Sequence, residues 1–120
     1  MAKIYIVDDS RVSRKVLASI LEEAGHTICG QAENGEIAVN NYKMCEPDLI
    51  TLDITMPVMD GIEALSLIRE TDKEIKVLMV TAAGQKGKVV DAVKHGASEF
   101  ITKPFENEKI LKAIEKCLAE

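Results

Sequence analysis

The chain lacks most features that mark nucleic-acid-binding, membrane or secreted proteins. Its 120 residues include no tryptophan, two phenylalanines and two tyrosines, too few aromatic rings for a surface on which bases stack. The net charge is −5 and no basic stripe is present, which argues against nucleic-acid binding. No apolar run approaches the ~20 residues that span a bilayer, and no signal-peptide-like segment opens the chain. We therefore expect a cytoplasmic protein.

Cysteine is scarce and scattered. Cys29, Cys45 and Cys117 are odd in number and form no CxxC pair and no cluster with histidine. This spacing disfavours both metal-thiolate and disulfide sites. We expect three reduced cysteines that serve as small apolar side chains.

The composition is that of a folded protein with a core. Apolar residues make up 47% of the chain and charged residues 29%. The length is typical of one domain, and no linker-like or low-complexity segment divides it. We expect residues 1–120 to form a single domain, with no room for a DNA-binding or enzymatic output domain.

Short apolar runs alternate with segments of helical periodicity. Five runs predict strands, several of them covered on both faces, at residues 4–7, 27–29, 49–52, 77–80 and 100–102. A helix is predicted after each run: from the cap Ser10 to the stop Gly25, over 34–44, over 61–70, over 84–95, and from the cap Asn107 onward. The apolar stripes of the first and fourth helices include Val12, Val16, Val90 and Val93.

Five strand–helix units in succession predict a doubly wound α/β fold. Right-handed crossovers favour a five-stranded parallel sheet in the flavodoxin-like order 2-1-3-4-5. In such sheets, ligands bind beyond the carboxyl ends of the strands. The residues that follow each apolar run are therefore the candidates for function.

Polar side chains end four of the five predicted strands. The first strand ends in Asp8 and Asp9, the third in Asp53, the fourth in Thr81 and the fifth in Lys103. Two carboxylates ~4 Å apart repel by about 4 kcal/mol at an effective dielectric of 20, and one ammonium cannot balance three carboxylates. An oxygen cluster of this kind suits Mg²⁺. Asp53 is then placed to act as a nucleophile in aspartyl-phosphate chemistry.

Each side chain taken alone has a simpler interpretation, such as a helix cap, a turn residue or a surface charge. Two other functional classes also use this fold or this chemistry. A flavin-binding module would need a Ser/Thr/Gly-rich phosphate loop where Asp8 and Asp9 stand. A hydrolase of the aspartyl-phosphate type usually carries a second aspartate where Thr55 stands. We expect neither, and no turnover of a metabolite: the protein is not an enzyme beyond its own phosphorylation and slow dephosphorylation.

Six short motifs occur at specific spacings along the chain. They are Val7-Asp8-Asp9-Ser10, Asp48-Leu49-Ile50-Thr51-Leu52-Asp53, Met56-Pro57-Val58-Met59-Asp60-Gly61, Val80-Thr81-Ala82, Gly96-Ala97 and Lys103-Pro104-Phe105. With these motifs, the chain resembles the receiver domain of bacterial and archaeal response regulators over essentially its whole length. Within that family it is most similar to stand-alone chemotaxis regulators of the CheY type.

The resemblance implies a phosphoprotein of a two-component signal-transduction system. Asp53 would be the phosphoacceptor, with Lys103 and Thr81 stabilising the phosphoryl oxygens. Thr81 and Phe100 would form the switch, in which the ring turns inward after phosphorylation. Phe100 stands where tyrosine is frequent, so a switch hydroxyl is missing. The Lys103–Pro104 peptide bond would be cis.

The resemblance also implies a Mg²⁺ site and a phosphoryl lifetime. Asp9, Asp53 and the backbone carbonyl of Thr55 would bind the ion directly, and Asp8 largely through water. Thr55 and Ala83 stand where family members vary and the lifetime is tuned. Because Ala83 has no carboxylate or amide to orient a water molecule, we expect slow to moderate self-dephosphorylation.

The partners implied are proteins. A histidine kinase, of the chemotaxis type, would phosphorylate Asp53. The face built by the fourth helix, fifth strand and fifth helix would then contact a flagellar motor switch or a phosphatase. The alternative is a phosphorelay intermediate that passes the phosphoryl group from Asp53 to a histidine phosphotransfer protein. We expect a monomer that contacts neither nucleic acid nor membrane.

Overall fold

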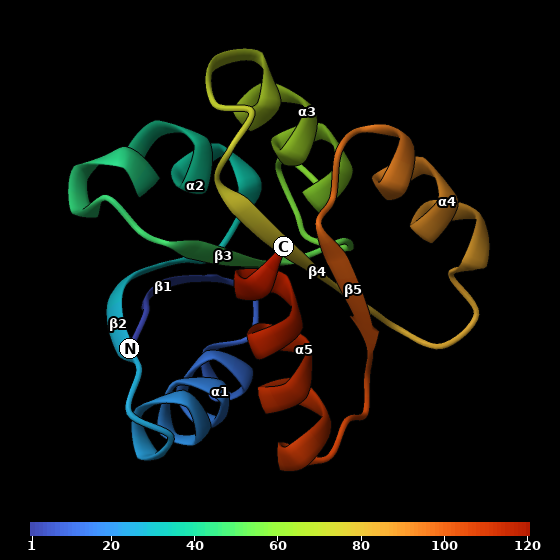
Figure 1. The fold of residues 1–120 in the computed structure, drawn as a ribbon. Helices are drawn as coiled ribbons and strands as arrows, with labels where there is room; N and C mark the ends of the chain where they lie inside the picture. Colours follow the sequence, from blue (N-terminus) through green and yellow to red (C-terminus); the bar gives the residue numbers. More distant parts are fainter.

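The structure is a computed structural model that describes residues 1–120. Strands and helices alternate along the chain (Figure 1). The strands are β1 (Lys3–Val7), β2 (Thr27–Ala32), β3 (Leu49–Asp53), β4 (Lys76–Thr81) and β5 (Glu99–Thr102). The helices are α1 (Arg11–Glu23), α2 (Gly35–Asn41), the 3₁₀ helix η1 (Tyr42–Cys45), α3 (Gly61–Thr71), α4 (Lys86–Lys94) and α5 (Asn107–Ala119).

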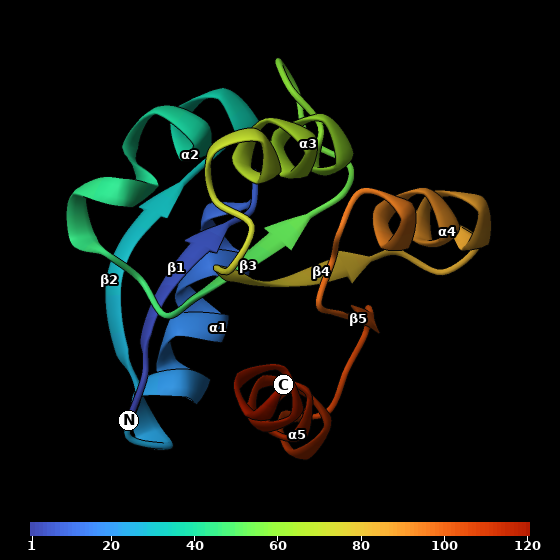
Figure 2. The same ribbon diagram turned by 45° about the horizontal axis from the view of Figure 1, so that its top comes forward.

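The strands form one parallel sheet in the order β2-β1-β3-β4-β5, which confirms the predicted topology. Helices α1 and α5 cover one face of the sheet, and α2, α3 and α4 cover the other (Figure 2). Because the strands are parallel, all five point their carboxyl ends toward the same edge of the sheet. None of the helices is long and apolar enough to cross a membrane.

Two apolar clusters hold the sheet between its helix layers. Alternate residues of the central strands β1 and β3 face opposite clusters: Ile4 and Leu49 pack toward α1 and α5, whereas Tyr5 and Ile50 pack toward α2 and α3. These four side chains are at most 4% exposed. Strands buried on both faces have little freedom to move, so the residues at their ends are held in fixed positions.

Side-chain caps begin three of the helices. Ser10, Asn34 and Asp60 each accept a hydrogen bond from the backbone N–H three residues later, at 2.9 to 3.2 Å. Each cap satisfies an N–H that has no partner within its helix. The cap predicted at Asn107 is wrong: α5 begins at that residue, and Glu106 precedes it without a side-chain capping bond.

Several apolar residues assigned to inward stripes lie at the surface instead. Val12 is 72% exposed, Val16 54%, Val90 54% and Val93 59%. In α4 the buried residue is Ala92, because this helix flanks the short edge strand β5 and presents only a narrow face to the core (Figure 1). The predicted segment 34–44 is likewise divided, ending as α2 at Asn41 and continuing as η1.

The prediction of three free cysteines is wrong for two of them. Cys29 of β2 and Cys45 of η1 are joined as a disulfide across 16 residues, with Cα atoms 5.9 Å apart. The two lie together because η1 returns alongside the edge strand, a tertiary contact that spacing in the sequence does not reveal. Cys117 is free and buried, as predicted.

Gly61, the first residue of α3, allows this helix to begin in close contact with the end of β3. A Cβ atom at this position would overlap the carbonyl oxygen of Asp53 and would lie 2.9 Å from Cα of Ile54. We expect Gly61→Ala to lower the free energy of unfolding by about 2–3 kcal/mol, because α3 must move away from β3. Denaturant unfolding of the purified variant measures this loss.

Gly87 is the matched control, since it lies in α4 and a Cβ atom added there would meet no neighbouring atom within 4 Å. Gly87→Ala should raise the stability by up to about 1 kcal/mol through helix propensity alone. Equal changes in the two variants would contradict this role of Gly61.

Candidate functional site

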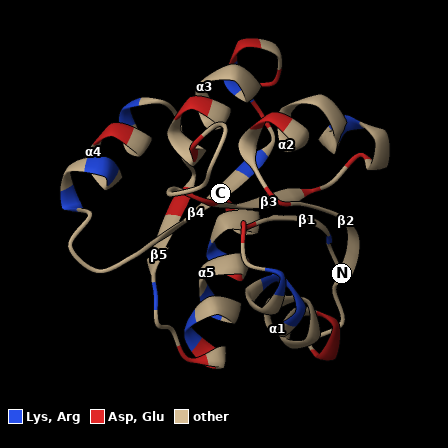
Figure 3. Ribbon diagram, turned by 180° about the vertical axis from the view of Figure 1, so that it is seen from behind, with Lys and Arg blue, Asp and Glu red and all other residues tan.

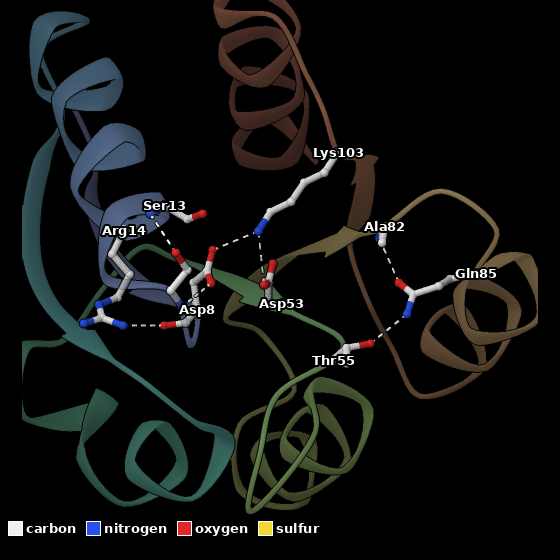
Figure 4. Close-up of polar contacts among 9 residues, drawn as sticks. Asp8, Ser13, Arg14, Asp53, Thr55, Ala82, Gln85 and Lys103 are labelled. Carbon is white, nitrogen blue, oxygen red and sulfur yellow. Dashed lines mark hydrogen bonds and ion pairs between the residues drawn. The ribbon is translucent and has the colours of Figure 1, made fainter.

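Four strand ends bring the predicted functional side chains together. Asp8 follows β1, Asp53 is the last residue of β3, Thr81 is the last of β4, and Lys103 follows β5. Backbone hydrogen bonds hold these ends in register: the N–H of Lys103 donates to the carbonyl of Thr81 at 2.7 Å. The side chains of Asp8, Asp53 and Lys103 converge at the edge of the sheet (Figure 4).

Lys103 bridges two buried carboxylates. Its Nζ atom lies 3.0 Å from Oδ2 of Asp8 and 3.2 Å from Oδ2 of Asp53 (Figure 4). Asp8 is 5% exposed and Asp53 8%. The ammonium thus neutralises part of the charge on a pair that burial would otherwise disfavour. Asp8 also accepts a hydrogen bond from the N–H of Ser10 at 2.8 Å, which fixes its orientation.

The electrostatics of Asp53 reflect this crowding. Burial and the neighbouring Asp8 carboxylate raise the pKa of Asp53 to about 7, although Lys103 acts in the opposite direction. Burial alone would lower the pKa of Lys103, but its contacts with Asp8 and Asp53 outweigh that effect and raise it. A full negative charge on Asp53 is therefore unfavourable unless a further cation is present.

A cation fits the oxygen atoms at this edge. Asp8, Asp9 and Asp53 each offer a carboxylate oxygen, and these atoms lie within 4.8 Å of one another. Asp9 is exposed, so the cluster is open to solvent on one side. Hard oxygen ligands with room for water are the set that Mg²⁺ prefers. The donors and the uncompensated charge both fit this ion.

A cavity of about 490 Å³ adjoins the carboxylates. Asp8, Asp53 and Lys103 line one end of it, while apolar side chains of α1, including Val12 and Val16, line another part. The Asp53 carboxylate is therefore reachable from outside even though little of its own surface is exposed.

The remaining predicted residues lie around this centre. The hydroxyl of Thr81 is buried, with its Oγ1 3.5 Å from Oγ1 of Thr102. Phe100 is 47% exposed, so its ring is turned outward in this structure. The Lys103–Pro104 peptide bond is cis. Ala83 is exposed and lies in the connection between β4 and α4.

Two residues near the centre were missed by the sequence analysis. Arg14 donates from Nη1 to the backbone carbonyl of Asp8 at 2.6 Å, and from Nε to the side chain of Gln31 at 3.2 Å. Gln85 joins the connection after β4 to Thr55, the residue two positions beyond Asp53. For Arg14, the available signal in the sequence was its position one helical turn after the cap Ser10. No sequence pattern indicates the contact between Gln85 and Thr55, because it depends only on the conformations of the loops.

The sequence also matches a known family. The family model described as "Response regulator receiver domain" matches residues 4–115, nearly the whole chain. The chain belongs to this family. The resemblance drawn from the six motifs is thus confirmed, and the strand order is that of the receiver fold.

Relatives of this receiver domain include chemotaxis proteins. It is 47% identical to "Chemotaxis protein CheY" of Listeria monocytogenes, over 97% of this chain and 98% of the relative. It is also 47% identical to the CheY of Halobacterium salinarum, over 98% of both chains. The fold matches the CheX-CheY-BeF3-Mg+2 complex of Borrelia burgdorferi at TM-score 0.92 and 41% identity, covering 98% of this chain and 90% of that one. The receiver domain is therefore CheY-like.

The raised pKa of Asp53 makes the stability of this receiver domain depend on pH. In the folded protein Asp53 binds its proton with a pKa of about 7, which is more tightly than an ordinary aspartate side chain with a pKa of 3.8. The contribution of Asp53 to the free energy of unfolding is therefore greatest below pH 4, and this contribution is lost as the pH rises to 7. In metal-free buffer, Asp53→Asn should be more stable than the parent at pH 8 by about 2–4 kcal/mol.

Denaturant unfolding of both proteins at several pH values measures the difference. The gap between them should close as the pH falls from 8 to 4, and it should shrink at pH 8 when Mg²⁺ is added. Parallel stability profiles across this range would contradict the assignment of the raised pKa to Asp53.

Proposed function

We propose that this CheY-like receiver domain is a phosphoacceptor switch in which Asp53 carries the phosphoryl group. The observation that supports this most strongly is the placement of Asp53, buried at the end of a central strand between an acidic pair and Lys103. A structural ion pair would need one carboxylate for one ammonium. Three carboxylates and one ammonium suit a centre that binds a cation and accepts an anion.

The transfer step needs only positioned charges. A carboxylate oxygen of Asp53 attacks the phosphorus atom of the donor, while the bond from phosphorus to the histidine nitrogen of a kinase breaks. The electron pair of that bond stays on the imidazole ring, which takes up a proton. Lys103 Nζ, 3.2 Å from Asp53, and the hydroxyl of Thr81 at the end of the neighbouring strand would stabilise the oxygens of the transferred group.

The acidic cluster would hold Mg²⁺ during this step. Asp8, Asp9 and Asp53 supply carboxylate oxygens, and the backbone carbonyl of Thr55 follows on the same connection. The bound ion would offset the negative charge that gathers as a phosphoryl group approaches a carboxylate. The related Borrelia burgdorferi CheY was solved with BeF3 and Mg+2, which supports this choice of ion.

The output of the switch would be a change at the face formed by α4, β5 and α5. Thr81 and Phe100 lie on neighbouring strands, with Met79 of β4 opposite Phe100 of β5. When the Thr81 hydroxyl bonds the phosphoryl group, space opens beneath the outward ring of Phe100, which can turn inward. Moving a population from 1:99 to 99:1 takes about 5.5 kcal/mol, a sum that a few charge-assisted hydrogen bonds can supply.

The output face has a mixed character that suits a protein partner. Val90, Val93 and Phe100 are exposed apolar side chains on or beside α4. Exposed lysines accompany them on the same helix, and Figure 3 shows basic residues along α4 and α5. Such a surface favours a partner segment with apolar and acidic side chains.

Chemotaxis is the pathway that the relatives favour over a phosphorelay. The relatives named above are chemotaxis proteins that match the chain over nearly their full length. We therefore propose a histidine kinase of the chemotaxis class as donor, in the cytoplasm. The phosphorylated form would act on a flagellar motor switch, and a CheX-like protein is a further candidate partner because the Borrelia burgdorferi relative forms such a complex. Ala83 provides no group to orient a water, so dephosphorylation without a partner should be slow to moderate.

Incubation with Mg²⁺ and acetyl phosphate tests the phosphoacceptor directly. The intact mass of the parent should rise by one phosphoryl group within minutes. No rise in mass should occur when EDTA is added before the donor. Asp53→Asn should gain nothing, because it lacks the nucleophile. Asp91→Asn, the same change at an exposed aspartate of α4, should gain as much as the parent.

Phosphorylation of Asp53→Asn to the level of the parent would contradict the proposal. So would a folded parent that gains no mass from acetyl phosphate and none from a chemotaxis-type histidine kinase with ATP. Transfer from that kinase to the parent, with no onward transfer to a histidine phosphotransfer protein, is the result expected of a chemotaxis regulator.

A further inference from the structure

The side chain of Gln85 connects the two loops that flank Asp53. Its Oε1 atom accepts a hydrogen bond from the backbone N–H of Ala82 at 2.8 Å. Its Nε2 atom donates to Oγ1 of Thr55 at 2.7 Å. Figure 4 shows the amide lying between the two groups. Both ends of one amide are thus used, one on each loop.

These two loops leave the sheet next to the phosphoacceptor. Strands β3 and β4 pair with Asp53 opposite Val80, and the N–H of Ile54 donates to the carbonyl of Val80 at 3.1 Å. Thr55 therefore follows Asp53 by two residues on one strand, and Ala82 follows the switch residue Thr81 on the next. A phosphoryl group on Asp53 would arrive between them.

The N–H of Ala82 is a donor that a phosphoryl oxygen can use. It is the first N–H beyond the end of β4 and its partner here is a neutral side-chain oxygen, that of Gln85. An anionic oxygen is the stronger acceptor, since hydrogen bonds to charged groups are roughly twice as strong as neutral ones. The amide of Gln85 therefore holds a position that the phosphoryl group would compete for.

We propose that Gln85 is a latch that holds the connection between β4 and α4 in its unphosphorylated position. The proposal rests on the function proposed above, in which Asp53 accepts the phosphoryl group. While the latch is closed, Thr55 and Ala82 are tied together in the connections that follow Asp53 and Thr81. Phosphorylation opens it, because a phosphoryl oxygen replaces Oε1 of Gln85 at the N–H of Ala82. Gln85 acts through other groups and is a positioning residue.

The proposal predicts how strongly the Gln85 contact favours the unphosphorylated conformation over the phosphorylated one. A contact that exists only in the unphosphorylated state shifts the equilibrium toward that state by its own free energy. Removing it should raise the affinity for a phosphoryl mimic by the corresponding factor, and the rate of phosphorylation by up to that factor. Since one or two partly exposed hydrogen bonds are lost, we expect a factor of about three to ten.

The test compares variants of the full chain in Mg²⁺. Gln85→Ala removes both bonds, and Thr55→Val removes one of them. Two measurements are made: the rate constant of phosphorylation by acetyl phosphate, followed by intact mass, and the affinity for beryllium fluoride by calorimetry. The affinity should rise about threefold to tenfold in Gln85→Ala and the rate constant by up to that factor, and both should rise less in Thr55→Val. The double variant should not exceed Gln85→Ala, because the two changes break one connection.

Three controls separate a latch from a simple loop contact. Lys86→Ala changes the next residue, which is exposed, and should match the parent. Thr55→Ser keeps the hydroxyl, so its effect should be smaller than that of Thr55→Val. The melting temperature of Gln85→Ala should fall by a few degrees without beryllium fluoride and should equal that of the parent when both are saturated with it, since a contact that only stabilised the loop would lower stability in both conditions and leave the affinity for beryllium fluoride unchanged.

The outcomes distinguish this proposal from the one on which it rests. If the parent is phosphorylated but Gln85→Ala matches Lys86→Ala in both measurements, the latch is overturned and the phosphoacceptor function stands. If the effects of Gln85→Ala and Thr55→Val multiply in the double variant, the two groups act independently and the latch is again overturned. If the folded parent takes neither phosphoryl group nor beryllium fluoride, both proposals fall together.

Discussion

Three carboxylates and one ammonium share the carboxyl edge of the sheet, and the remaining features of the site depend on this unbalanced charge. Asp8 and Asp53 are almost fully buried, and Lys103 contacts both. Repulsion within the cluster would push these side chains apart if their strands could move. The strands are held by apolar clusters on both faces of the sheet, so the repulsion remains; burial and this repulsion together raise the pKa of Asp53 to about 7.

The same arrangement separates rigid parts of the molecule from adjustable ones. The groups proposed to perform the chemistry sit at strand ends, and packing of the buried strands β1, β3 and β4 sets the positions of most of them. The groups proposed to report the phosphorylated state lie in connections and at the surface: Thr55 and Gln85 beside the site, and Phe100 on the edge strand β5. A small local change at Asp53 can therefore move loops without disturbing the sheet.

The strand order and the polar strand ends were predictable from sequence because they depend on local patterns. Apolar runs mark the strands, and each polar residue follows its run directly, so the residues of the carboxyl edge could be identified from their order along the chain. The cap Ser10 was predictable for the same reason.

What depends on tertiary contacts was not predictable. Helical periodicity assigned Val12 and Val93 to the apolar stripes of their helices. Both side chains are exposed, because periodicity does not show how much of each helix surface the sheet covers. The pairing of Cys29 with Cys45 requires η1 to return beside β2. The bridge from Gln85 to Thr55 depends on the conformations of two loops. Val58, exposed with φ of 69°, likewise adopts a backbone conformation that β-branched residues rarely take, so its residue type gave no signal for it.

The central claim is that the phosphoryl group is carried by Asp53, and locating it chemically is the most direct test. Sodium borohydride reduces an aspartyl phosphate to homoserine, which survives digestion and can be placed by peptide sequencing in a mass spectrometer. After phosphorylation in Mg²⁺, we predict homoserine at residue 53 and unmodified aspartate at residues 8 and 9. Homoserine at either of those two positions, or its absence from a protein whose mass shows a phosphoryl group, would contradict the claim.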